Sequence, residues 1–343
     1  MGLSSSRAKL LLSHYCLALA LSSALSAQAQ VSDPDLQILR QEQREQSLRR
    51  QAEPQARVQS EIAQPALAKL PADESPCQTI QRLTLKGQMA DRFQWSLQAA
   101  SRDDDPALGR CLGAQGIAIV MQRVQQAILA RGYVTTRVLA EPQDLRGGEL
   151  VLTLVPGRVR QLRLSDDSHP RARLGNAMPV DEGDVLNLRT LEQGLENLKR
   201  LPTADADMQI AASEAANAQP GDSDVIVRWQ QRLPYRLNLS VDNSGIESTG
   251  RYQGAITFSY DHWWTLNDLF YLSYSDTLGG SLPGPRGSRS GTLHYSLPYR
   301  DWLLGFTASE FRFYQSVAGL NGRVSYSGEG MTHDLALTRL LYR

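Results

Sequence analysis

The side chains that most often carry out chemistry are few in this sequence and are not grouped. The five histidines are scattered, and none has the His-x-x-x-His or Cys/His spacing that holds zinc: His14, His169, His262, His294 and His333. The chain also lacks a Gly-x-Ser-x-Gly nucleophile turn, a phosphate-binding loop and a dinucleotide-binding glycine pattern. We therefore expect no catalytic residue, no metal site and no cofactor, and we expect that the protein is not an enzyme.

One acidic run could suggest a cation site. Asp103, Asp104 and Asp105 are consecutive, but the alternating ligand spacing of a calcium loop is missing. The interpretation that we favour is a solvated loop. The paired glycines Gly147 and Gly148 likewise indicate a turn rather than a phosphate site, because no helix is predicted to begin there.

The N-terminus has the pattern of a secretory signal peptide over residues 1–29. Arg7 and Lys9 precede an apolar run, and Ala27-Gln28-Ala29 supplies the small-x-small cleavage pattern. Removal of this segment would leave two cysteines, Cys77 and Cys111. An even number of cysteines in an exported protein favours a disulfide between them over two free thiols.

The charge balance excludes some classes of protein. The 343 residues contain 36 Lys and Arg against 36 Asp and Glu, which does not fit a nucleic-acid binder or a disordered chain. Residues 30–53 contain strong helix formers but are polar nearly all round, so this helix must lie in water. Residues 54–76 are rich in Ala, Gln and Pro and are predicted to form an extended linker.

Two segments then share one order of elements, which predicts two small β-α-β-β modules in tandem at 77–156 and 157–232. In the first, a strand over 79–87, a helix over 117–131 and strands over 134–140 and 149–155 follow from the apolar spacing. In the second, the helix is expected over 187–201, between a strand over 158–166 and strands over 207–213 and 224–230.

From residue 233 to residue 343 the apolar period changes to two. About six long strands with one apolar and one polar face, bounded by aromatic residues such as Trp263, Trp264 and Trp302, are typical of an outer-membrane β-barrel. A soluble β-sandwich would alternate as well and stays open as an alternative. Glu310, Arg312 and Arg339 interrupt the pattern, and we expect them to point into the lumen, because charges facing lipid are destabilising.

Taken together, these segments resemble the outer-membrane transporter of two-partner secretion systems, the haemolysin-activator and filamentous-haemagglutinin transporter family. The resemblance rests on the order and spacing of several stretches. They are Ser75–Ile80, Gly132–Val138, Pro142–Leu145, Val155–Val159, Leu188–Leu198, Arg200–Pro202, Val241–Gly245 and Ser248–Gly250.

The resemblance implies an α+β fold of two tandem POTRA modules followed by a transmembrane antiparallel β-barrel. It implies a location in the outer membrane of a Gram-negative bacterium, with the N-terminal modules in the periplasm and the polar helix in the pore. The implied partners are a large secreted exoprotein with an N-terminal secretion domain, outer-membrane lipid and the barrel-assembly machinery. The exoprotein would be exported unfolded and without nucleotide, whether it is an adhesin, a haemolysin or a contact-dependent toxin.

By the same resemblance, capture could add an exoprotein strand to a sheet edge of a module. The candidate edge lies in the strand expected over 134–140. Its candidate binding residues are Val134, Thr135, Thr136, Arg137 and Val138.

The sequence departs from the family pattern at the C-terminus. The family's barrel has about sixteen strands, whereas only about six are expected here, too few to close a barrel without exposed backbone groups. The expectation is therefore a fragment, a truncated reading frame or a pseudogene remnant. A barrel-assembly insertase relative and a soluble periplasmic POTRA-type binding protein are the alternative functions.

Overall fold

The computed structural model describes residues 33–53, 58, 68–279, 286–319 and 322–341. The expected signal peptide and most of the expected linker lie outside the described residues. Helix α2 (Asp33–Ala52) is built largely of Gln, Arg, Glu and Leu, and Pro34 stands in its first turn, where its missing N–H has no helical partner to lose. Among the described residues, no helix combines the length and the apolar character needed to cross a bilayer.

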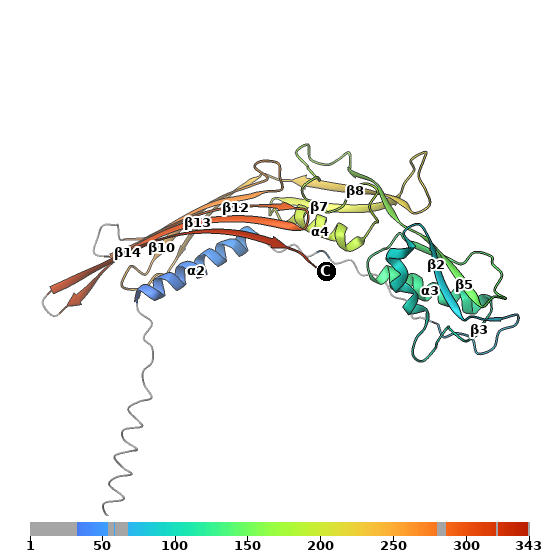
Figure 1. Cartoon of the computed structure of the whole chain (residues 1–343). Coiled ribbons are helices and arrows are strands. Elements are labelled where there is room, and N and C mark those ends of the chain that lie inside the picture. Colours follow the sequence, from blue (N-terminus) through green and yellow to red (C-terminus); the bar gives the residue numbers. More distant parts are fainter. Residues whose placement is uncertain (1–32, 54–57, 59–67, 280–285, 320–321, 342–343) are drawn as a thin grey trace, which may run out of the picture. The chain divides into compact units, whose positions relative to one another are not determined.

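The first module is a three-stranded sheet covered by helix α3. Its elements are β1 (Gln78–Thr79), β2 (Arg82–Gly87), the 3-10 helix η1 (Ala90–Ala100), β3 (Cys111–Leu112), α3 (Ala114–Ala130), β4 (Arg137–Leu139) and β5 (Glu149–Val155). The strand order is β2-β5-β4, with β5 parallel to β2 and antiparallel to β4. Alternate residues of β5 are buried, Leu150, Leu152 and Leu154, and form one core with the apolar face of α3 (Figure 1).

Two features of the first module differ from expectation. Helix η1 was not predicted from the pattern, although its Phe93 is buried in the core. The acidic run is only partly solvated, so the loop interpretation is wrong for its last member. Asp105 is buried, accepts hydrogen bonds from Leu70 N and from the fully buried Arg123, and forms an ion pair with Arg110 at 2.5 Å. The Leu70 N–H, together with these guanidinium groups, lowers the pKa of Asp105 to about 2.

The second module repeats the order of elements. It contains β6 (Arg158–Leu164), α4 (Leu188–Lys199), β7 (Ala204–Ala212) and β8 (Asp222–Gln231), with the strand order β6-β8-β7. Asn187 begins α4 as its N-cap, because its side chain accepts a hydrogen bond from Arg189 N at 2.8 Å. Leu191 and Leu198 then pack with Trp229 in a separate buried core.

The last part of the chain is a six-stranded antiparallel sheet. Its strands are β9 (Tyr235–Asp242), β10 (Gln253–Asp261), β11 (Leu269–Thr277), β12 (Arg286–Tyr299), β13 (Trp302–Gly319) and β14 (Gly322–Arg339). Each strand pairs with the next in sequence, so β9 and β14 are the two edges of a curved sheet that does not close (Figure 1). The predicted order of two α+β modules followed by about six antiparallel strands is confirmed.

Candidate functional site

One face of the six-stranded sheet is lined by small hydroxyl side chains. Its buried Ser and Thr residues include Ser259, Ser273, Ser275, Thr277, Ser290, Thr292, Ser296, Thr307 and Ser309. The hydroxyls bond to one another across strands, as Ser275 Oγ does to Ser290 Oγ at 2.7 Å. This face is therefore hydrophilic, as the lumen of an outer-membrane barrel is.

The opposite face is apolar and exposed. It carries Leu237, Leu239, Ile256, Phe258, Leu272, Leu293, Leu304, Phe306, Leu335 and Leu337. Leu272, Leu293 and Ala308 are cross-strand neighbours, so the apolar surface continues from strand to strand. Trp263, Trp264 and Trp302 lie at one end of it, where an interfacial aromatic girdle would lie.

The expectation that the charged residues point into the lumen is wrong. Glu310 pairs with Met331 and lies two positions from Ala308, so it shares the apolar face, and Arg312 follows it on that face. Arg339 is also on this face, with its guanidinium 5.0 Å from the Trp302 ring centre. Strand length accounts for Arg312, because β13 and β14 have 18 residues each, whereas Glu310 lies at about 21 Å from the level of Trp302, still inside a band of about 25 Å. At about 3.4 Å per residue and a tilt of about 40°, Arg312 lies about 25 Å from the level of Trp302, the full height of an apolar band.

A polar cluster around Glu53 joins three parts of the chain at the end of the sheet. The Glu53 carboxylate accepts hydrogen bonds from Arg200 Nη2 at 2.5 Å and from the Ser296 hydroxyl, and it lies 3.6 Å from His294 Nε2. Burial alone would raise the pKa of Glu53, but bonding to His294 and the charge of Arg200 lower it to about 2. Glu53 is therefore ionised at neutral pH.

Arg200 anchors the second module to the sheet from the C-terminal end of α4. Its side chain is 10% exposed and donates to the carbonyl oxygen of Asn267 at 3.1 Å as well as to Ser296 Oγ at 2.8 Å. Burial lowers the pKa of Arg200, and the carboxylate of Glu53 opposes that effect. In the last turn of α2, Arg49 donates to Thr307 Oγ1 at 3.1 Å on the polar face.

The candidate capture edge is shorter than predicted. Strand β4 begins at Arg137, so Arg137 and Val138 lie on an edge strand, whereas Val134, Thr135 and Thr136 precede it. These three residues belong to the junction between the modules. Val134 packs against the core of the second module, and Thr136 Oγ1 accepts a hydrogen bond from Gly157 N at 3.0 Å. Contacts with the second module thus compete with strand pairing at these positions.

Beside this edge, two glutamine side chains form hydrogen bonds with backbone N–H and C=O groups, in the place that a neighbouring strand would take. Neither of them was predicted from the sequence. Gln125 of α3 bonds to Thr136 O and to Val138 N, at 2.9 and 2.8 Å. Gln143 bonds to both Val151 O and Val151 N, at 2.8 and 2.7 Å, beyond the end of β4. Gln143 lies in the Pro142–Leu145 stretch of the family resemblance, which was the one available signal.

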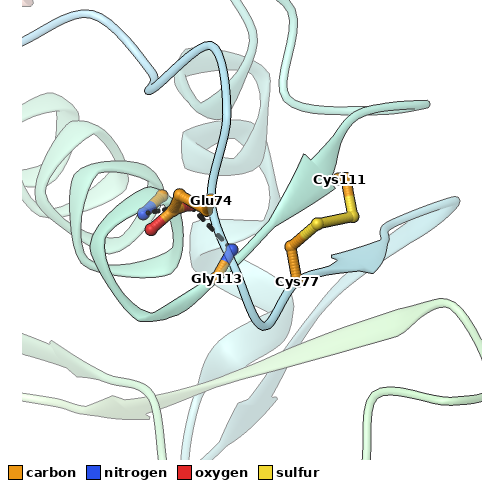
Figure 2. Close-up of a disulfide and its surroundings, with 5 residues drawn as sticks. Glu74, Cys77, Cys111 and Gly113 are labelled. Carbon is orange, nitrogen blue, oxygen red and sulfur yellow. Dashed lines mark hydrogen bonds between the residues drawn. A yellow bond between two sulfur atoms is a disulfide. The ribbon is translucent and has the colours of Figure 1, made fainter.

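Cys77 and Cys111 form the expected disulfide, which closes the start of the first module (Figure 2). Near it, the Glu74 carboxylate accepts hydrogen bonds from Gly113 N at 2.7 Å, Gln115 N at 2.9 Å and Gly116 N at 3.0 Å. N–H groups at the start of a helix have no partner within the helix, so Glu74 stabilises the start of α3 from outside it. Within the described part of the chain, no three His, Cys, Asp or Glu side chains are grouped so as to hold a metal ion.

Three family models match consecutive parts of the chain. Residues 79–157 match the ShlB-type POTRA domain, and residues 158–212 match a POTRA domain. Residues 221–343 match the haemolysin secretion/activation proteins ShlB/FhaC/HecB. The chain belongs to this family. The resemblance to two-partner secretion transporters is thereby confirmed.

The chain is similar to individual relatives along most of its length. Outer membrane transporter CdiB-2 of Burkholderia pseudomallei is 36% identical over 83% of this chain and 50% of its own length. Hemolysin transporter protein ShlB of Serratia marcescens is 28% identical over 84% of this chain and 49% of its own length. The solved structure of CdiB from Acinetobacter baumannii superposes with a TM-score of 0.76 and 29% identity, over 90% of this chain and 58% of that chain. The chain spans about half the length of its curated relatives, which are named as transporters rather than enzymes.

Proposed function

We propose that this chain contributes the periplasmic modules and part of the wall of an outer-membrane pore that exports an unfolded exoprotein in a two-partner secretion system. The observation that carries the proposal is the six-stranded sheet, polar on one face and apolar on the other, in direct continuity with two POTRA modules. An apolar face suits lipid and a hydroxyl-lined face suits a hydrated path. The matched relatives, named as transporters of this family, support the same assignment.

The modules would capture the exoprotein in the periplasm by strand addition at β4. An extended segment that pairs through its backbone needs no particular sequence, which suits a long unfolded substrate. Arg137 and Val138 lie on the edge strand where such a segment would add. Export would need no nucleotide: none is available in the periplasm, and folding of the exoprotein outside the cell would give the transport its direction.

The Glu53 cluster would hold the end of the polar helix beside the polar face. Glu53 contacts Ser296 of β12 and Arg200 of the second module, so one carboxylate ties the helix, the module and the sheet together. The last turn of the helix, where Arg49 bonds to Thr307, would thereby be held beside the hydroxyl-lined face. The expected domain limits, 30–53 for this helix, 77–156 and 157–232 for the modules and 233–343 for the barrel part, belong to the same proposal.

The test is a deletion of the gene in its host, with and without a plasmid copy. We expect a large protein to disappear from the culture medium on deletion and to return on complementation, and we expect the chain in the outer-membrane fraction. An unchanged set of secreted proteins would refute the transport proposal. Recovery of the chain in the soluble periplasmic fraction would instead favour the soluble binding protein.

A further inference from the structure

The outward backbone groups of strand β4 are already hydrogen bonded. Val138 pairs with Leu154 of β5, but its N–H donates to Gln125 Oε1 at 2.8 Å, so the N–H points away from the sheet. Gln125 Nε2 donates to the neighbouring outward group, Thr136 O, at 2.9 Å. Thr136 is fully buried and Val138 is 4% exposed, so water has little access to these two groups. One side-chain amide thus bonds to both groups, and Arg137 Nη1 also donates to Thr136 O at 3.3 Å.

The pattern of these two bonds is that of a paired strand. In a parallel ladder, one residue donates its N–H to residue i−1 and accepts from the N–H of residue i+1 of its neighbour. Gln125 does this with Thr136 and Val138, on either side of Arg137. Gln143, by contrast, bonds to both the N–H and the C=O of one residue, Val151, as a residue of an antiparallel strand does, and its Nε2 also donates to Glu141 O at 3.1 Å. Each amide therefore replaces one residue of a missing strand.

The free edge of the second module is protected in another way. On β7, Ala206 N and Met208 N donate to Asp205 Oδ1 and Asp207 Oδ1, at 2.9 and 2.8 Å. These carboxylates belong to the strand itself and place charged side chains along the edge, where Asp205 also forms an ion pair with Lys199 at 3.2 Å, and charged side chains at an edge discourage strand addition. The β4 cap is neutral and comes from a helix. A rotation of the Gln125 side chain would therefore expose the β4 groups without leaving a buried charge.

We propose that Gln125 is a displaceable cap on the β4 edge, whose amide gives way to the backbone of an extended exoprotein segment during capture. This inference rests on the proposed capture at β4. An incoming segment would replace the Gln125 bonds one for one and would gain further bonds beyond Val138. The cap would thereby keep the empty edge from pairing with other chains, at the expense of slower and weaker capture.

The test uses the full chain in detergent and a soluble 12-residue probe peptide of alternating Thr and Val with Lys at both ends. The peptide carries a fluorophore and a benzophenone. The same peptide, N-methylated at alternate amides, cannot pair as a strand and is the probe control. Gln125→Met keeps the length of the side chain and removes the amide. Gln122→Met, at an exposed position of the same helix, is the matched control.

If the inference is right, the Val138 amide exchanges with deuterium at least ten-fold faster in Gln125→Met than in the original chain. The probe then binds about five-fold more tightly to this variant, and its crosslinks map to residues 134–140. Gln122→Met should change neither quantity. Gln125→Glu keeps an acceptor for Val138 N but sets a carboxylate oxygen against Thr136 O, and it should also speed exchange. It serves as the second variant if Gln125→Met does not fold.

The outcomes separate the two proposals. Crosslinks at 134–140 with equal or weaker binding to the Gln125 variants would overturn the cap and leave capture at β4 standing. No crosslink at 134–140 in any variant, or equal binding of the N-methylated peptide, would overturn capture at β4 and the role of the cap with it. Unchanged exchange of the Val138 amide in both Gln125 variants would overturn the cap whatever the peptide does.

Discussion

The contacts of the Glu53 carboxylate with His294, Arg200 and Ser296 should contribute a large and pH-dependent share of stability. The side chain of Glu53 is 19% exposed, and its pKa falls from 4.5 to about 2 in the folded protein. At 1.36 kcal/mol per pKa unit, this depression corresponds to about 3 kcal/mol that favours the folded state at pH 7. Glu53→Gln, which keeps the size of the side chain and removes its charge, should therefore lower the free energy of unfolding by about 3 kcal/mol.

The direction of the pH effect follows from the lowered pKa. The contribution of Glu53 is complete above pH 4.5 and is lost as the pH falls through 2, so it should be constant between pH 5 and 7. At pH 3 the difference between the original chain and Glu53→Gln should be less than half of its value at pH 7. Mild acidification alone should not release Glu53 from Arg200.

The assay is denaturant unfolding of the full chain in detergent, followed by tryptophan fluorescence at pH 3, 5 and 7. Glu214→Gln, at an exposed position, is the matched control. A double-mutant cycle with Arg200→Met should give a coupling energy of about 1 to 3 kcal/mol. The reasoning is refuted if the Glu53→Gln difference is the same at pH 3 and pH 7, or if the coupling is below about 0.5 kcal/mol, the usual limit of additivity.

Three further predictions test other parts of the structure. Replacing Cys77 and Cys111 together by Ser should lower the free energy of unfolding by about 3 to 4 kcal/mol, and a reducing agent should then no longer shift the unfolding midpoint. Gln143→Met removes the two hydrogen bonds to Val151 and a third to Glu141 O, and it should cost about 1 to 3 kcal/mol, with faster deuterium exchange at Val151; unchanged exchange there would contradict it. Leu293→Arg on the apolar face should destabilise the membrane-inserted protein by about 2 to 4 kcal/mol, whereas Thr292→Arg on the polar face should be tolerated, and equal yields in the outer-membrane fraction would contradict this assignment of faces.

The repeated order of elements was readable from the sequence because each element has its own apolar period. Helix α4 has leucines on one face and an Asn cap, and its observed limits, Leu188–Lys199, lie within two residues of those expected. The face of Arg312 was not readable, since the rule that charges avoid lipid holds only inside the apolar band. Where that band ends depends on the length of β13, and a sequence pattern leaves strand ends uncertain.

The caps on the first module show a second limit of sequence reasoning. Periodicity identifies residues that form backbone ladders, but it does not identify a side chain that replaces a strand. Gln125 lies 11 residues before Thr136 on another element, and a half-buried glutamine on a helix has no distinctive pattern. The same reasoning placed the start of strand β4 three residues too early, because Val134 to Thr136 continue the strand pattern while Val134 and Thr136 contact the second module. An edge strand is therefore defined by what its outward N–H and C=O groups bond to. By that criterion the part of β4 open to an incoming segment begins where the Gln125 amide lies.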